Sequence, residues 1–348
     1  MLSFRLRPLP RRLTTHPSSS SSSSTPCLST PSISFSISSE VEDEDDNTNN
    51  ENPEDLFSSF LPHLFPDDAP QFHGDPGQHL LYSSPRYGDL TIMVPSYPGQ
   101  REDQSEVIAG GVNNVEEGRK LFAHFLWSAA MVVAEGVENA ADFGDGKSNW
   151  NGNGDGGMWR VQGERVLELG AGAGLPSIIS ALAHASSITI TDHPSSPALG
   201  TSGAISTNVR HNLHELNSIG KCTIDIRPHE WGTLTTDTWA ASTKGTYTRI
   251  IAADCYWMPL EHENLVRTMK WFLAPEGKVW VVAGFHTGRG ILAGFFETAG
   301  RMGLEVERIY ERDLMSSGEC RRAWVSEREG EGLENRKRWC VIALLRHA

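Results

Sequence analysis

Short apolar runs alternate with longer amphipathic stretches from residue 165 to residue 301. Such runs are typical of strands buried in a parallel sheet, and apolar residues at three- and four-residue spacing are typical of the helices that cover it. The alternation therefore predicts an α/β fold with a doubly wound parallel sheet. The predicted strands span residues 165–169, 188–191, 222–227, 249–253 and 278–283, and the predicted helices span residues 175–184, 197–218, 233–243, 259–273 and 288–301.

Two later apolar runs, at residues 304–309 and 339–345, flank a charged loop at 311–337. We expect them to close the sheet as a final antiparallel hairpin. The complete prediction is a Rossmann-like, mostly parallel sheet of seven strands.

The region before the first parallel strand carries weaker patterns. Residues 79–85 and 89–95 predict a β-hairpin, and apolar residues at helical spacing predict a helix over residues 115–135. A stretch rich in Gly, Asn and Asp at 142–157 predicts a flexible insert.

The first 55 residues differ in composition from the rest of the chain. Residues 1–39 contain four arginines, no acids and long Ser, Thr and Pro runs, and residues 40–55 contain nine acids and no base. Neither part offers enough apolar surface to offset the entropy of ordering, so we expect a disordered tail. Its Arg- and Ser-rich, acid-free start is also compatible with a mitochondrial targeting segment, although Pro8 and Pro10 would interrupt an amphipathic helix. We expect a cytoplasmic protein, with a mitochondrial location as the alternative.

Charge and cysteine content exclude several classes of function. The 348-residue chain has a formal net charge of −14, which is unfavourable for binding nucleic acid and better suited to a basic or neutral substrate. No stretch reaches the roughly 20 apolar residues of a membrane span. The five cysteines form no C-x-x-C pair, so we expect neither a zinc site nor a disulfide framework.

The segment Val166-Leu-Glu-Leu-Gly-Ala-Gly-Ala-Gly-Leu-Pro176 carries the most chemical information. Its three alternating glycines permit a tight turn and a close approach of the backbone to a ligand, and Pro176 suits the first turn of a helix. A turn of this kind places a nucleotide-like ligand at the carboxyl edge of a parallel sheet, although glycine-rich turns also occur as plain packing devices.

Glu168 distinguishes between the possible ligands. Dinucleotide sites carry G-x-G-x-x-G and place a pyrophosphate at the helix N-terminus, whereas the spacing here is G-x-G-x-G and the preceding acid would repel a phosphate. A carboxylate at this point can instead accept a hydrogen bond from an ammonium group. The pattern therefore favours S-adenosylmethionine, whose amino-acid end is cationic, over NAD.

Acidic and aromatic residues at two other strand ends fit the same ligand. Asp192 follows Gly170 by 22 residues, an offset at which an acid accepts hydrogen bonds from ribose hydroxyls; a turn residue before Pro194 is the alternative. Trp231 could lie against the adenine ring, or it could be part of the edge of the core.

The fourth strand ends in Asp254-Cys-Tyr-Trp257. A buried carboxylate is costly unless it is paired or hydrogen-bonded, so we interpret Asp254 as a catalytic residue that orients an amine acceptor and takes up its charge. Tyr256 and Trp257 are candidates to line the acceptor slot and to hold a methylated ammonium by cation–π contacts. His286 could face the substrate or be hydrogen-bonded in a turn.

Taken together, these segments resemble the seven-strand S-adenosylmethionine-dependent methyltransferases, specifically lysine methyltransferase family 16. The resemblance covers about residues 113–345 and rests on five segments: Leu126-Trp-Ser-Ala-Ala130, 166–177, Thr191-Asp-His-Pro194, Trp231-Gly232 and 254–257. Together with the composition of the chain, it divides the sequence into a disordered tail at 1–55, an N-terminal extension at 56–112 and a methyltransferase domain at 113–348.

The resemblance also implies roles for individual residues. Trp127, Gly170, Ala171, Gly172, Asp192, Trp231 and Ala253 would contact the cofactor, and Asp254 and Trp257 would mark the acceptor channel. The family includes fungal enzymes that methylate the N-terminus and a nearby lysine of elongation factor 1-alpha, and fungal proteins labelled nicotinamide N-methyltransferase-like.

We therefore expect an S-adenosylmethionine-dependent N-methyltransferase, acting as a monomer on a lysine or α-amine of a protein such as elongation factor 1-alpha. A methyltransferase of small amines or pyridines such as nicotinamide is the alternative within the same chemistry. A cofactor-binding interaction module without catalysis is the alternative from another class.

Overall fold

The computed structural model describes residues 2–9, 72–96, 124–141, 157–214, 222–316 and 319–348. The expectations for the rest of the tail up to residue 55, for the start of the domain at 113–123 and for the insert up to residue 156 lie outside the described residues.

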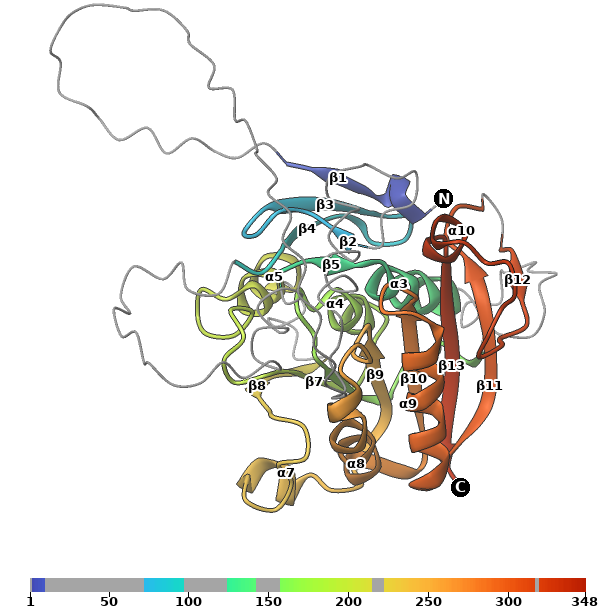
Figure 1. Ribbon diagram of the computed structural model, residues 1–348. Coiled ribbons are helices and arrows are strands. Elements are labelled where there is room, and N and C mark those ends of the chain that lie inside the picture. The colour runs from blue at the N-terminus through green and yellow to red at the C-terminus, as the bar shows by residue number, and fades with distance from the viewer. Residues whose placement is uncertain (1, 10–71, 97–123, 142–156, 215–221, 317–318) are drawn as a thin grey trace, which may run out of the picture.

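An eight-stranded sheet forms the centre of the molecule, in the order β12-β11-β13-β10-β9-β6-β7-β8 (Figure 1). Its strands are β6 (Arg165–Leu169), β7 (Ser187–Asp192), β8 (Thr223–Pro228), β9 (Tyr247–Ala253), β10 (Leu273–Gly284), β11 (Leu304–Asp313), β12 (Arg321–Arg322) and β13 (Trp339–His347). The five neighbouring strands β8, β7, β6, β9 and β10 are parallel to one another. Strand β13 lies between β10 and β11 and is antiparallel to both. The predicted doubly wound sheet and its final hairpin are confirmed. The eighth strand, which the sequence did not predict, is the two-residue β12 inside the charged loop.

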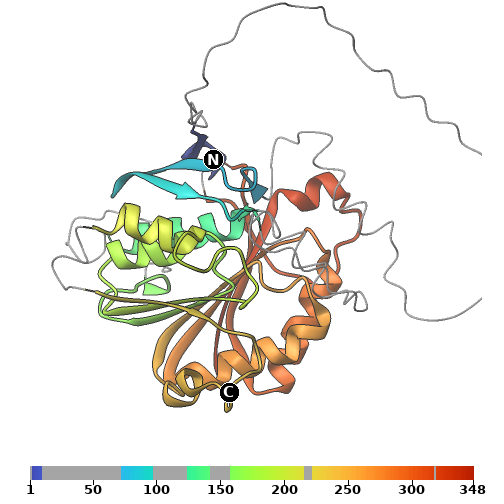
Figure 2. The same ribbon diagram turned by 90° about the vertical axis from the view of Figure 1, so that its left-hand side faces the viewer.

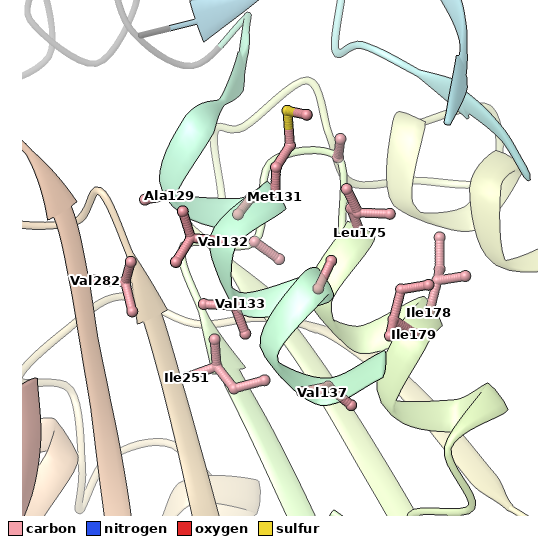
Figure 3. Packing of buried hydrophobic residues seen from close by; sticks show 14 of the residues in the cluster. Ala129, Met131, Val132, Val133, Val137, Leu175, Ile178, Ile179, Ile251 and Val282 are labelled. Carbon is pink, nitrogen blue, oxygen red and sulfur yellow. The ribbon is translucent and has the colours of Figure 1, made fainter. Parts of the chain in front are cut away.

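Helices cover both faces of this sheet. The helices α3 (Ser128–Ala141), α4 (Leu175–Leu182) and α5 (Ala204–Asn212) share one apolar core with alternate strand residues such as Ile251 and Val282 (Figure 3). The helices α8 (His262–Phe272) and α9 (Arg289–Arg301) share the other core with the intervening residues Ile250 and Val281. Successive strand residues point to opposite faces, so a continuous apolar run fills both cores.

Several predicted helices are shorter in the structure. The helix expected at 115–135 begins at Ser128, because β5 (Leu126–Trp127) pairs with β2 (Phe72–His73) just before it. The helix expected from residue 197 begins only after Gly203. Gly203 packs against the carbonyl oxygen of Leu199 so closely that an added Cβ would lie 2.2 Å from it, so the chain before the helix folds back on itself there.

The segments after β8 and β9 also differ from the predicted helices. The helix expected at 233–243 is reduced to α7 (Thr238–Ser242), which begins where the carboxylate of Asp237 accepts from the Trp239 amide. A 3-10 turn, η5 (Pro259–Glu261), precedes α8, and the short α10 (Leu333–Lys337) lies in the loop before β13.

A small second sheet lies over α4 and α5, on the side away from the main sheet (Figure 2). It contains the predicted hairpin, β3 (His79–Ser84) and β4 (Gly88–Met93). The backbone of β4 exchanges hydrogen bonds with the side-chain amides of Asn208 and Asn212 on α5. Its third strand was not expected. The chain start forms a 3-10 turn, η1 (Leu2–Arg5), and then β1 (Leu6–Pro8), which pairs with β3. The prediction of a tail disordered from its first residue is therefore wrong for residues 2–8.

No helix among the described residues is long and apolar enough to cross a membrane.

Candidate active site

The glycine turn between β6 and α4 has the conformation that its sequence predicts. Gly170, Gly172 and Gly174 have φ angles of 62°, 54° and 71°, in the left-handed region that favours glycine. The amide of Ala171 donates to the carbonyl of Thr191 (3.0 Å), which ties the turn to the end of β7. A Cβ added at Gly172 would meet no atom of the protein within 4 Å, so this backbone faces open space at the carboxyl edge of the sheet.

Glu168 lies beneath this turn and is 1% exposed. Its Oε2 accepts from the backbone amide of Ser177 in the first turn of α4 (3.0 Å). Burial raises the pKa of Glu168 to about 8. The carboxyl group thus anchors the helix that follows it, a role that the sequence analysis did not foresee. Its contact with an ammonium group stays a prediction.

Asp192 braces the glycine turn from β7. Its Oδ2 accepts from the amide of Gly172 (2.7 Å) and its Oδ1 from the amide of His193 (2.7 Å). Burial raises the pKa of this carboxyl group above its usual value. The side chain is half-buried and also accepts from the Ser196 side chain, and its two oxygens together keep a lone pair for a ribose hydroxyl.

Trp231 and Cys255 lie close to the glycine turn at Gly170. A Cβ added at Gly170 would lie 2.9 Å from the Cys255 sulfur and 3.4 Å from Cζ2 of Trp231. Trp231 is half-buried, and so is Ala253 at the end of β9. The structure therefore gathers Trp231 and Gly170 at one place, as an adenosine-binding edge requires. Cys255, which the sequence analysis did not select, lies against Gly170, and its thiol donates to the carbonyl of Leu169 at the end of β6 (3.2 Å).

Asp254 is held in place by β10 and α3. Its backbone is in the left-handed region, with a φ of 54°, and its amide donates to Val282 of β10 (2.9 Å). The carboxylate accepts from the amide of Gly284 at the end of β10 (2.8 Å, to Oδ1) and from the amide of Ala129 at the start of α3. At 6% exposure, burial raises the pKa of Asp254 to about 7, so that this group titrates near neutrality.

Trp127 and His286 lie beside this carboxylate. Their rings stack with centroids 4.6 Å apart, and Nδ1 of His286 is 3.8 Å from Oδ1 of Asp254. Burial lowers the pKa of His286 to about 4, which makes the imidazole neutral at physiological pH. Trp127, expected at the cofactor, is thus brought to the acid of the expected acceptor channel.

The two aromatic residues after Asp254 have different surroundings. Tyr256 is 1% exposed, donates its hydroxyl to the carbonyl of Ala252 (2.8 Å) and packs on Phe295 in the core. The prediction that Tyr256 lines the acceptor slot is therefore wrong, because the side chain points into the sheet–helix interface. Trp257 is half-buried, and its role at the acceptor stays a prediction.

Comparison with known proteins gives this arrangement a family. Residues 111–299 match the family model described as lysine methyltransferase, which is more than half of the chain. The chain belongs to the lysine methyltransferase family. The match runs from before α3 to residue 299 in the last turn of α9, so it contains every residue of the site described above.

Individual relatives are similar over the same region. The chain is 29% identical over 204 residues to the "Protein N-terminal and lysine N-methyltransferase EFM7" of Gibberella zeae, with 55% of this chain and 69% of the relative covered. It is 25% identical over 241 residues to the efm7 protein of Aspergillus fumigatus, with 65% and 84% covered. A solved structure of a TehB-like methyltransferase from Corynebacterium glutamicum is 15% identical, with a TM-score of 0.35 and 60% of this chain and 88% of that chain covered.

This lysine methyltransferase family member is accordingly an S-adenosylmethionine-dependent enzyme, and its residues fit that cofactor. The open backbone at Gly172 leaves room for a ligand, and the carboxyl groups of Glu168 and Asp192 suit a cationic amino acid and a ribose. Among the described residues, no group of three or more His, Cys, Asp and Glu side chains is placed to hold a metal ion. The predicted cofactor is confirmed at the level of the family.

Proposed function

We propose that this enzyme transfers a methyl group from S-adenosylmethionine to a lysine side chain or an α-amine of a protein. The observation that carries the proposal is the buried carboxyl group of Asp254, at the edge next to the glycine turn and flanked by Trp127 and His286. The names of the relatives, which specify protein N-terminal and lysine N-methylation, support the same acceptor class.

The chemistry explains why an acid is useful there. The bound cofactor supplies an activated methyl carbon, and the acceptor nitrogen forms a bond to it as the carbon–sulfur bond breaks. An amine attacks only when it is neutral, and a lysine in water has a pKa of about 10.4. Asp254 can accept a hydrogen bond from the acceptor amine and hold it in line, which is the main task of an enzyme for this displacement.

The environment of Asp254 suits a group that takes up and releases a proton during catalysis. A carboxyl group with a pKa of about 7 is partly ionised at neutral pH, so it can take up a proton from the amine and release it again. The stacked rings of Trp127 and His286 add an uncharged wall beside it. The net charge of −14 attracts a basic protein segment rather than an acidic one.

A labelling experiment tests the acceptor class. The purified enzyme is incubated with methyl-labelled S-adenosylmethionine and, in parallel, with proteins of a fungal lysate, purified elongation factor 1-alpha, and nicotinamide. We expect label in protein, and mass spectrometry should find increments of about 14 Da on lysine or at an N-terminus. Acetylating all amines of the acceptor proteins beforehand is the matched control and should abolish incorporation.

The outcomes separate the alternatives. Label found only in nicotinamide, or incorporation into fully acetylated proteins, would contradict the proposal. Label in lysate proteins but not in elongation factor 1-alpha would leave the acceptor class standing and exclude that particular partner.

A further inference from the structure

The half-buried guanidinium group of Arg5 ties the start of the chain to the methyltransferase domain. Arg5, at the end of η1, donates to Glu138 and to Glu135 of α3, the latter at 3.1 Å, and also to the hydroxyl of Tyr82 on β3 (3.1 Å). Leu2 is 5% exposed, so the first turn also buries an apolar side chain. Residues 2–9 (the N-terminal strap) thus combine an apolar contact, an ion pair and the β1–β3 pairing.

The carboxylate that receives Arg5 is difficult to bury without a partner. Glu138 is 3% exposed, and burial raises its pKa while Arg5 opposes that rise. Its polar surroundings are the Tyr82 hydroxyl, the Ser84 hydroxyl and, on the same helix, the like charge of Glu135. Arg5 is the charged group that offsets the cost of burying this carboxylate.

The helix that the strap holds is the one that positions Asp254. The first turn of α3 donates the Ala129 amide to the Asp254 carboxylate and follows directly after Trp127. Glu135 and Glu138 lie six and nine residues further along this rigid rod, and Glu135 also pairs with Arg312 of β11. A helix rises about 1.5 Å per residue, so the strap contacts α3 some 9–14 Å along the helix axis from the Ala129 amide, which donates to Asp254.

We propose that Arg5 is a positioning residue: through the N-terminal strap it clamps α3 and so fixes the Ala129 amide and Trp127 against Asp254. The strap comes from outside residues 111–299, the part of the chain that matches the family model. The acceptor side of the site is therefore ordered only when the N-terminal strap is docked on α3.

The clamp has a matched internal control. Arg7 is two residues along the strap, but its pair with Asp89 is exposed, with 63% and 53% of the two side chains accessible. Exposed pairs contribute little, so Arg7→Ala removes an arginine side chain from the same N-terminal strap at small cost. Arg5→Ala leaves a buried carboxylate without its cation.

The test compares wild type, Arg5→Ala, Arg5→Lys and Arg7→Ala as full-length chains, without any acceptor. We expect the melting temperature to fall by about 5 °C or more in Arg5→Ala and by about 1 °C or less in Arg7→Ala. Arg5→Lys should restore part of the loss. Hydrogen exchange should be faster at the first turn of α3 in Arg5→Ala, with no such change in Arg7→Ala.

The pH dependence separates a charge clamp from simple packing. Without Arg5, the pKa of Glu138 in the folded chain rises further above its unfolded value. The destabilisation should therefore be small near pH 4 and should grow as the pH rises towards 8. The double variant Arg5→Ala/Glu138→Gln should recover most of the lost stability, because no carboxylate remains to be buried.

Unchanged exchange at the first turn of α3 in a destabilised Arg5→Ala variant would overturn the positioning role. A melting-temperature loss that is independent of pH and not rescued by Glu138→Gln would overturn the charge clamp. None of these measurements requires methyl transfer, so their failure is distinct from a failure of the proposed function.

Discussion

Two buried carboxyl groups, Glu168 and Asp254, face the same edge of the sheet from neighbouring strands and are held in similar ways. Each stands at the end of a parallel strand, and each accepts from a backbone amide in the first turn of a helix, Ser177 for Glu168 and Ala129 for Asp254. A carboxylate is favourable at a helix N-terminus, where amides without intrahelical partners point outward. In both cases burial outweighs these hydrogen bonds and raises the pKa, to about 8 and about 7.

The two sites differ in where their partners come from. Glu168 is bound by the helix that follows it nine residues later, so its site is complete within one strand–turn–helix unit. Asp254 is bound by a helix that precedes it in the chain by more than 100 residues, and by the end of the adjacent strand at Gly284. The setting of Glu168 is therefore local, whereas that of Asp254 depends on the assembly of distant segments.

The largest expected effect comes from Asp254→Asn. The side-chain oxygen of asparagine can accept from one of the two backbone amides, Gly284 or Ala129. Its NH₂ group then faces the other amide, donor against donor, and it cannot take up a proton. We expect methyl transfer to fall by at least about 100-fold and the free energy of unfolding to fall by about 1–3 kcal/mol. Rate measurements and denaturant unfolding check this, with Asp89→Asn, at an exposed acid, as the control. A stable variant that keeps more than a tenth of the rate would reduce Asp254 to a structural residue.

A smaller effect is expected from Glu168→Gln, because glutamine can still accept from the Ser177 amide. We expect nearly unchanged thermal stability at neutral pH but weaker binding of S-adenosylmethionine, by about tenfold at pH 8.5, since the charge-assisted hydrogen bond to the ammonium is lost. Titration calorimetry measures this. Equal affinities for both proteins would mean that Glu168 serves only to anchor α4.

Comparing Gly170→Ala with Gly172→Ala distinguishes the effect of backbone strain from the effect of lost ligand contact. Ala at either Gly170 or Gly172 has to adopt a positive φ, at a cost of roughly 1–2 kcal/mol of folding stability. Gly170→Ala should lose more, because its Cβ would also meet the Cys255 sulfur, whereas a Cβ at 172 meets no protein atom. We expect Gly172→Ala to lower cofactor affinity beyond its effect on stability, as calorimetry and melting curves would show. Normal affinity in this variant would place the ligand elsewhere.

A separate effect is the change of stability with pH. Both carboxyl groups hold their proton more tightly in the folded chain than in the unfolded chain. Without ligand, the free energy of unfolding should therefore decrease as the pH rises from about 4 to about 8.

Binding of a cation favours the ionised form, so S-adenosylmethionine should release a fraction of a proton near pH 7. Calorimetry in buffers with different ionisation enthalpies detects this release, and Glu168→Gln should reduce it. Uptake of protons instead would contradict the assigned sign of charge at the site.

The outcome of the sequence analysis follows the same division between local and distant partners. The strand–turn–helix from Arg165 to Leu182, the choice of cofactor and the succession of parallel strands along the chain were predictable, because glycine positions and apolar periodicity act over a few residues. The burial of Tyr256, the pairing of Leu126–Trp127 with a strand, and the start of α3 at Ser128 were not predictable. Each of these depends on which distant segment lies alongside.

The start of the chain shows this dependence most clearly. Its arginines and serines, read alone, have the composition of a disordered tail, and only the folded molecule brings Arg5 to Glu138. By itself, the sequence determined a doubly wound sheet with an S-adenosylmethionine turn, because backbone geometry and apolar periodicity are encoded locally. The tertiary structure alone decided which amides hold Asp254 and which cation offsets a buried carboxylate, because burial and charge pairing depend on neighbours that are distant along the chain.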